Sequence, residues 1–139
     1  MARHLQASLL AALIAFTSLN AVMAGTIRYN RDIRPILSDQ CFFCHGPDKN
    51  KRKADLRLDI REEALKTTKD HEAAFVPGKP DASELVKRIL TDDEDDLMPP
   101  PESKKTLTDA QKALLKQWVA EGAVYEPHWA YTALVKPAV

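Results

Sequence analysis

Apolar residues recur at helical spacing in the segment from Ile27 to Gln40. The repeat follows an i, i+3, i+4 pattern and consists of Ile33, Ile36 and Leu37. Asp32 is predicted to be the N-cap, which places Pro35 in the first turn, where its missing N–H is harmless. We therefore expect a short helix that leads directly into Cys41.

A second helix is predicted after the turn-rich segment Val76 to Pro80. Asp81 is followed three residues later by Glu84, which is the pattern of a capping box, and the apolar spacing continues to about Leu90. The positions expected to be buried are Leu85, Val86, Ile89 and Leu90.

The clearest helix lies near the C-terminal end of the sequence. Thr108 and Gln111 form a capping box, and Gly122 stands where a helix-terminating glycine is expected. Apolar residues repeat between them at helical spacing, namely Ala110, Leu114, Leu115, Trp118 and Val119.

The remaining segments are less regular. Alternation of Leu56, Leu58 and Ile60 with charged residues suits a brief extended segment, and residues 61–66 suit about two helical turns. Residues 91–103 are expected to form a loop, because the run Pro99 to Pro101 cannot be helical throughout. Residues 125–139 show no clear period.

The first 24 residues have the pattern of a secretory signal peptide. Arg3 and His4 form a positive start, Leu9 to Phe16 an apolar run, and Val22 to Ala24 a small-residue cleavage site. The alternative is an uncleaved anchor, but this run is much shorter than the ~20 residues of a membrane-spanning helix. We expect residues 1–24 to be removed and the chain to be exported to the periplasm or another extracytoplasmic compartment, without stable membrane insertion.

Composition and charge narrow the classes of partner. The 20 Lys and Arg residues balance the 20 Asp and Glu residues, so the chain lacks the basic excess that nucleic-acid binding requires. Two clusters of opposite sign remain, one at Lys49 to Lys53 and one at Asp92 to Asp96. They are either ordinary solvated surface or charges that orient a redox protein partner.

Both cysteines of the chain belong to one short motif. Cys41 and Cys44 are three positions apart, and His45 follows directly. This is the pattern of covalent haem c attachment, in which two thiols add to the vinyl groups of one porphyrin and the histidine becomes an axial ligand of its iron.

Two other readings of the motif compete. A zinc site needs two more ligands, for which only His71 and His128 are available, without paired-ligand spacing. A reactive dithiol or a disulfide between Cys41 and Cys44 suits an exported protein but leaves His45 unexplained.

The second axial ligand is predicted to be Met98. Met1 and Met23 lie in the predicted signal peptide, so Met98 is the one thioether left, and the stiff proline run after it can hold a sulfur atom in place. A core methionine before a linker is the alternative, in which case His71 or His128 would supply the ligand.

The order of several motifs resembles the Planctomycete-type cytochrome c domain. They are Tyr29 to Leu37, the motif Cys41 to His45 with Gly46-Pro47-Asp48, Leu56 to Asp59, Val76 to Pro80, Leu97 to Pro100, and Trp118 with Gly122-Ala123. The similarity extends from about Ile27 to Val124. It implies an all-α, cytochrome c-like fold, with a few short helices wrapped around one covalently bound haem.

The resemblance also implies the roles of individual residues. Cys41 and Cys44 carry the thioether bonds, and His45 and Met98 bind the iron. Trp118 either contacts the porphyrin or packs against the N-terminal helix. In mitochondrial-type cytochromes the Gly-Pro pair that orients the histidine comes well after the motif, whereas here Gly46-Pro47 follows at once, which leaves open the acceptor of the ring N–H.

We therefore expect three parts: a signal peptide at residues 1–24, a cytochrome c domain at 25–125, and a C-terminal tail or truncated linker at 126–139. The expected function is single-electron transfer by a monohaem c-type cytochrome that is not itself an enzyme. Its partner is a redox protein or an adjoining domain of a longer oxidoreductase. The alternatives are a haem enzyme or gas sensor with an open distal site, and an exported interaction module without haem.

Overall fold

The computed structural model describes residues 26–69, 72–127 and 130, and among these residues it contains helices, turns and loops but no strand. The all-α expectation agrees with this arrangement. The predicted signal peptide, His71, His128 and most of the tail lie outside the described residues.

The N-terminal helix begins earlier than the sequence indicated. A π-helical turn, η1 (Tyr29–Ile33), continues directly into α2 (Arg34–Gln40), with Pro35 in the first turn of α2 as expected. The stripe of Ile33, Ile36 and Leu37 is buried. One further turn, α3 (Phe42–His45), follows at Cys41.

The predicted role of Asp32 as N-cap is wrong, because the helical turn already starts at Tyr29. The Asp32 carboxylate instead accepts the backbone N–H of Arg28 at 2.8 Å and is paired with the guanidinium of Arg31. These bonds, that of Arg31 first, lower the pKa of Asp32 to about 2.

Helix α5 (Glu84–Leu90) ends where predicted but is not capped as predicted. Pro80 starts a 3₁₀ turn, η2 (Pro80–Ala82), so Asp81 lies inside that turn and Ser83 takes the N-cap position, without a side-chain cap bond. Leu85, Val86 and Ile89 are buried as expected. Leu90 is 46% exposed, so its predicted burial is wrong.

Helix α6 (Asp109–Ala120) agrees with the prediction at both ends. Thr108 and Gln111 form the reciprocal capping box, and Gly122 has a φ of 103°, which favours glycine. The buried face consists of Leu115, Trp118 and Val119, whereas Ala110 is exposed.

Two intermediate segments differ in detail from expectation. No strand forms at residues 56–60, where residues 58–60 make a turn, although Leu58 is buried as the alternation indicated. The helix predicted at 61–66 is a single turn, α4 (Arg61–Ala64). The loop after α5 contains one 3₁₀ turn, η3 (Pro101–Ser103).

A cluster of four aromatic rings joins the two ends of the described chain. Tyr29 of η1 stacks on Tyr125 at 4.2 Å between ring centroids, and Trp118 of α6 meets Phe75 edge-on at 5.0 Å. The indole N–H of Trp118 donates to the carbonyl of Val124 at 3.0 Å. Burial raises the pKa of Tyr29 to about 12 and also raises the pKa of Tyr125, so both phenols stay protonated.

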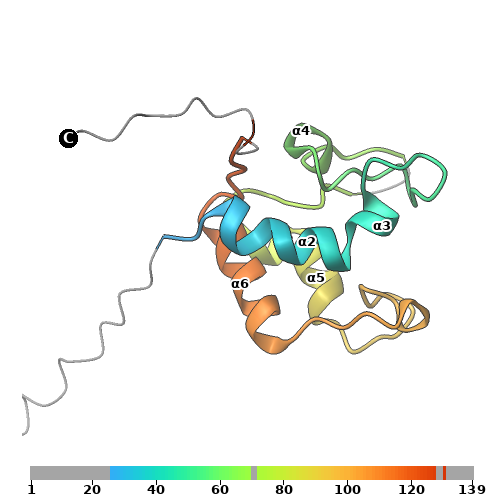
Figure 1. Ribbon diagram of the computed structural model, residues 1–139. Coiled ribbons are helices and arrows are strands. Elements are labelled where there is room, and N and C mark those ends of the chain that lie inside the picture. The colour runs from blue at the N-terminus through green and yellow to red at the C-terminus, as the bar shows by residue number, and fades with distance from the viewer. Residues whose placement is uncertain (1–25, 70–71, 128–129, 131–139) are drawn as a thin grey trace, which may run out of the picture.

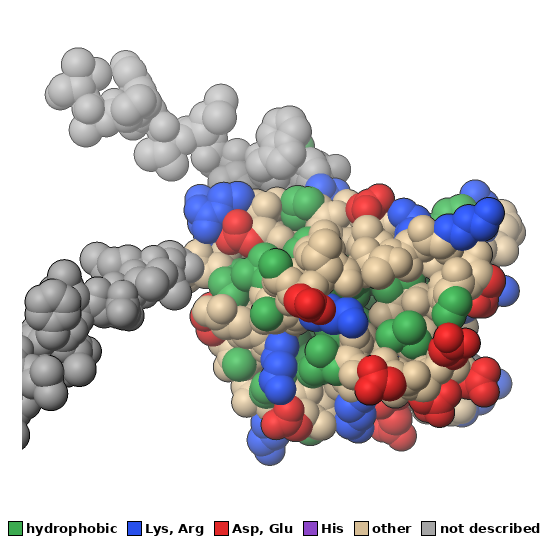
Figure 2. Space-filling model, turned by 90° about the horizontal axis from the view of Figure 1, so that it is seen from below, with side chains coloured by type: hydrophobic (Ala, Val, Ile, Leu, Met, Phe, Trp, Pro, Cys, Tyr) green, Lys and Arg blue, Asp and Glu red, His purple; other side chains and the backbone are tan. Residues whose placement is uncertain are grey.

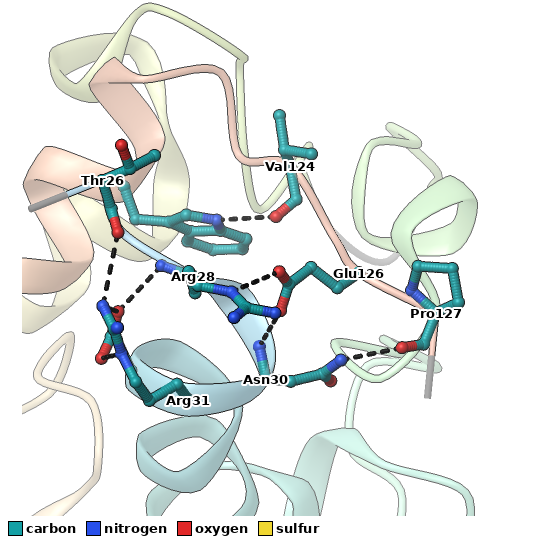
Figure 3. A network of polar contacts seen from close by, with 9 residues as sticks. Thr26, Arg28, Asn30, Arg31, Val124, Glu126 and Pro127 are labelled. Carbon is teal, nitrogen blue, oxygen red and sulfur yellow. Dashed lines mark hydrogen bonds and ion pairs between the residues drawn. The ribbon is translucent and has the colours of Figure 1, made fainter. Parts of the chain in front are cut away.

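Polar contacts reinforce the same junction (Figure 3). Glu126 accepts the backbone N–H of Asn30 at 2.9 Å and pairs with Arg28 at 3.1 Å. The Asn30 side chain donates to the carbonyl of Pro127 at 2.8 Å. The segment after α6 is therefore fastened to η1.

These contacts set the arrangement seen in Figure 1. Helix α6 contacts η1 and α5, and α3 continues from the far end of α2. The core therefore lies between the N-terminal helix and α6, and α3 carries the cysteine motif to the edge of this core.

Candidate functional site

A single turn of helix presents the three residues of the cysteine motif. The N–H of Cys41 donates to Leu37 at 2.9 Å, which continues α2, and the Cys41 carbonyl accepts the N–H groups of Cys44 at 3.1 Å and His45 at 2.9 Å. Residues three apart on such a turn share a face. Both thiols are unbridged and partly buried. The donor set thus has the chemistry that attachment of a porphyrin through two thioethers and a histidine requires.

The environment of Cys41 disfavours a reactive dithiol. Its side chain packs against the core, and this burial raises the pKa of the thiol to about 12, with the nearby charge of Lys105 acting in the opposite direction. Nucleophilic cysteines of dithiol motifs instead need a lowered pKa. At neutral pH Cys41 is therefore held as the neutral thiol.

No group of three or more His, Cys, Asp or Glu side chains that could hold a metal ion occurs among the residues that the structure describes. His71 and His128, which the zinc reading and the alternative axial ligands require, lie outside those residues.

The chain after His45 returns along the motif and is held there by backbone hydrogen bonds. The N–H of Lys53 donates to the carbonyl of Cys44 at 2.8 Å, and the N–H of Leu58 donates to the carbonyl of His45 at 2.8 Å. The carbonyl of Leu58 in turn accepts the hydroxyl of Tyr125 at 2.7 Å. The backbone of His45 is thereby connected to the aromatic cluster.

Gly46 occupies a position that has no room for a side chain. A Cβ atom built on it would lie 2.3 Å from the carbonyl oxygen of Phe42. The backbone of Gly46 therefore passes directly over the start of α3, and this close approach explains the glycine that follows His45.

Met98 lies half-buried in the loop after α5, and its backbone and the residues just before it are anchored to that helix. Its N–H donates to the carbonyl of Arg88 at 2.9 Å, and the Arg88 side chain pairs with Asp96 at 3.2 Å. The Met98–Pro99 peptide bond is cis, which the sequence did not indicate.

One contact ties the Met98 loop to the cysteine motif. Lys105 donates to the backbone carbonyl of Asp39 and pairs with its carboxylate at 3.1 Å, and Asp39 lies two residues before Cys41. Figure 1 shows α3 and this loop at the same end of the molecule, to the right of α6. The two sequence-distant parts of the predicted site are thus fastened to the same helix end.

Trp118 lies in the aromatic cluster, where it contacts Tyr29, Phe75 and Tyr125. It is almost completely buried there. Trp118 therefore packs in the core and reaches the N-terminal helical segment at Tyr29, and a contact between Trp118 and a porphyrin stays a prediction.

The two charge clusters have different surroundings. Lys49, Lys51 and Lys53 are exposed beside the cysteine motif, and the ammonium of Lys51 lies 4.7 Å from the ring centre of Phe43, which is 61% exposed. Residues 92–96 are exposed on the Met98 loop. Figure 2, which views the molecule from below, shows acidic side chains gathered at the right-hand side, the end at which this loop lies in Figure 1.

Arg52 and Tyr125 are contributors to the site that the sequence analysis did not identify. Arg52 lies within a run of lysines and has the appearance of one more solvated charge, while Tyr125 stands in a segment without periodicity. Leu58, which connects Tyr125 to the backbone of His45, did have a sequence signal, because the alternation of residues 56–60 predicted its burial.

Within the described part of the chain, no helix has both the length and the apolar character needed to cross a bilayer.

Comparison with known proteins gives one family. No curated protein and no solved structure matches the chain. The model of the Planctomycete cytochrome C family matches residues 41–102, a range that starts at the first cysteine of the motif and includes Met98. The first turns of the chain and α6, which the resemblance in the sequence also covered, lie outside this range. The resemblance is confirmed over residues 41–102, where the chain matches the model of the Planctomycete cytochrome C family.

Proposed function

We propose that this chain is an exported c-type cytochrome domain that carries one covalently attached haem and transfers single electrons. The observation that carries the proposal is the helical turn that presents Cys41, Cys44 and His45 at the start of the segment that matches the cytochrome C family. Haem binding and electron transfer are what this family match supports.

Each member of the donor set has a distinct role in the proposal. Cys41 and Cys44 form the thioether bonds, His45 supplies the proximal nitrogen, and Met98 supplies the distal thioether. Haem c, when bound, supplies an iron that alternates between the ferric and ferrous states. If His45 and Met98 both bound the iron, no coordination site would be left for substrate, and we propose that the domain has no enzymatic activity of its own.

The thioether of Met98, as an iron ligand, would raise the redox potential of the haem. A soft sulfur ligand favours the reduced iron and so raises the potential relative to bis-nitrogen ligation. The anchoring of the Met98 backbone to Arg88, and of the loop to Asp39 through Lys105, supports this role because a ligand on a fastened loop loses little entropy on binding.

We further propose that the basic side of the motif docks an acidic redox partner, either a separate protein or another domain. The exposed ring of Phe43 between the two cysteines and the exposed Lys49, Lys51 and Lys53 support this proposal. Opposite charge on a partner would speed encounter and make the rate depend on salt. Export is supported by the pattern of residues 1–24 and by the cytochrome C match.

The test of the distal ligand is the substitution Met98→Ala in protein produced in a host that attaches haem c. The wild-type ferric spectrum should be low-spin and contain the sulfur-to-iron charge-transfer band. In the variant this band should disappear, the midpoint potential should fall, and carbon monoxide should bind the ferrous iron. A variant with the wild-type band and potential would exclude Met98 as the ligand and leave the histidines as candidates.

A further inference from the structure

Arg52 is a charged residue whose side chain is withdrawn from water beside the segment that follows His45. Its side chain is 9% exposed, whereas the neighbouring Lys51 and Lys53 are exposed. Burial of a cation is unfavourable unless its donors are matched by acceptors. The buried position of this guanidinium therefore requires acceptors that offset the loss of its hydration.

The guanidinium makes contacts through all three of its nitrogens. Its Nε donates to the carbonyl of Gly46 at 3.1 Å, and one terminal nitrogen, Nη2, donates to the carbonyl of Pro47 at 3.1 Å. The other, Nη1, pairs with Asp55 at 3.1 Å, and the Asp55 side chain is itself 81% exposed. The bond to the carbonyl of Gly46 is thus partly buried, whereas the bonds to Pro47 and Asp55 lie at the surface.

These bonds complete a series of four consecutive carbonyl groups. The carbonyls of Cys44 and His45 accept the backbone N–H groups of Lys53 and Leu58. Those of Gly46 and Pro47 accept the Arg52 fork. The backbone on both sides of His45 is therefore held by donors from residues 52–58, and for the carbonyls of Gly46 and Pro47 the donor is the side chain of Arg52.

We infer that Arg52 is a positioning residue for His45, and that its fork on Gly46 and Pro47 sets the orientation in which the imidazole meets the iron. The inference rests on the proposed function. A planar guanidinium suits two successive carbonyls because its donors have fixed directions, whereas a lysine keeps the charge but loses the fork. The charge of Arg52 and its geometry can therefore be separated by substitution.

The experiment compares haem-loaded wild-type protein with Arg52→Gln, Arg52→Lys and a control, Arg61→Gln. Arg61 is a half-buried arginine whose Nε also donates to a backbone carbonyl, that of Ala123 at 3.2 Å, away from the segment after His45. The readouts are the proton NMR shifts of the haem methyl groups in the ferric state, which depend on axial ligand orientation, and the midpoint potential.

We expect Arg52→Gln to redistribute the haem methyl shifts and to lower the potential, because it removes both the fork and a buried positive charge. Arg52→Lys should redistribute the shifts while its potential stays closer to that of wild type. Arg61→Gln should leave both readouts unchanged.

Wild-type shifts in both Arg52 variants would overturn the inference, as would a change in Arg61→Gln as large as that in Arg52→Gln. If Arg52→Gln does not retain haem, Arg52→Lys decides: altered shifts support the inference and wild-type shifts overturn it. Failure of the proposed function is recognised separately, because wild-type protein itself would then lack covalent haem or low-spin iron.

Discussion

Gly46 shows how one residue type is fixed by the space around it. Its φ is negative, so the left-handed region is not the reason for the glycine. The reason is the carbonyl oxygen of Phe42, which would lie 2.3 Å from any Cβ. The sequence placed a glycine after His45 but could not reveal the oxygen that excludes a larger residue, because that contact depends on how the chain leaves α3.

The substitution Gly46→Ala should therefore destabilise the protein by about 1–3 kcal/mol, the usual cost of forcing extra atoms into a packed site. Because the shift occurs next to His45, the fraction of chain that carries haem should also fall. Denaturant unfolding and the ratio of haem absorbance to protein measure the two effects. Gly78→Ala is the control: its φ of 76° adds local strain, but a Cβ meets no heavy atom within 4 Å, so haem loading should not change. Equal haem content in wild type, Gly46→Ala and Gly78→Ala would show that the close contact at Gly46 does not affect haem attachment.

Asp32 is not the N-cap that the sequence predicted, and its carboxylate is used differently. As an acceptor near a helix start it does accept a backbone N–H, but that of Arg28 rather than one further along the helix. Its pKa is lowered from 3.8 to about 2, first by the Arg31 side chain and then by this backbone bond.

A lowered carboxyl pKa means that the charged form stabilises the folded state. The contribution of Asp32 is complete above its ordinary pKa of 3.8 and is lost as the pH falls toward about 2. We expect wild type to lose stability in this interval more steeply than Asp32→Asn, and the two to converge at the acid end. Urea midpoints measured between pH 5 and pH 2 test this; parallel curves would refute it. The effect should be small because the partner Arg31 is exposed and solvent screens a pair at the surface.

At the level of elements, the sequence predicted three helices from their apolar spacing, and all three exist. The C-terminal ends agree with the prediction, but the stops differ: Gly122 follows α6, whereas α5 ends at Thr91 in extended backbone and α2 passes at Cys41 into α3. The N-terminal ends were accurate only for α6. The capping box predicted from Asp81 and Glu84 does not form, because Pro80 begins a 3₁₀ turn that contains Asp81. The first helix starts earlier than predicted, because the apolar pattern did not reveal the π-helical turn η1.

The two predicted capping boxes give a matched test. Thr108→Ala removes a cap bond that the structure contains and should cost about 1 kcal/mol of stability. Asp81→Ala removes only the pairing with Lys116 at 3.2 Å, and Asp81 is almost fully exposed, so the loss should be about 0.5 kcal/mol or less. Denaturant unfolding of the haem-loaded proteins compares them. A larger loss from Asp81→Ala would show that this helix start is wrong.

At the level of the whole molecule, the site combines local and distant contributions. The cysteine motif is local and could be recognised from sequence, since one helical turn brings its residues together. The contact of Lys105 with Asp39 and the path from Tyr125 through Leu58 to His45 join residues more than sixty positions apart. Such pairs depend on how distant segments meet in the fold and carry no periodic signal in the sequence. The role of Trp118 in the core was one of two sequence alternatives, and its neighbours became known only from the fold.

The charge distribution of the whole surface predicts how small redox reagents react. Lys51→Glu reverses a charge beside the cysteine motif and should slow the oxidation of the ferrous protein by anionic ferricyanide several-fold at low salt. Oxidation by a cationic cobalt complex should become faster instead. Stopped-flow rates measure both, and both differences should shrink as salt increases.

The control for this comparison is Lys79→Glu, which makes the same charge change at an exposed turn outside the basic cluster. Equal effects of the two substitutions on the ferricyanide rate would show that only net charge matters and that the basic side has no special access to the iron.

The most direct test of the central claim is the intact mass of the wild-type chain, purified under denaturing conditions from a host with a haem-attachment system. We expect a mass that exceeds the processed polypeptide by one haem, retained because Cys41 and Cys44 bind it covalently. A mass equal to that of the polypeptide alone would show that the two cysteines carry no haem.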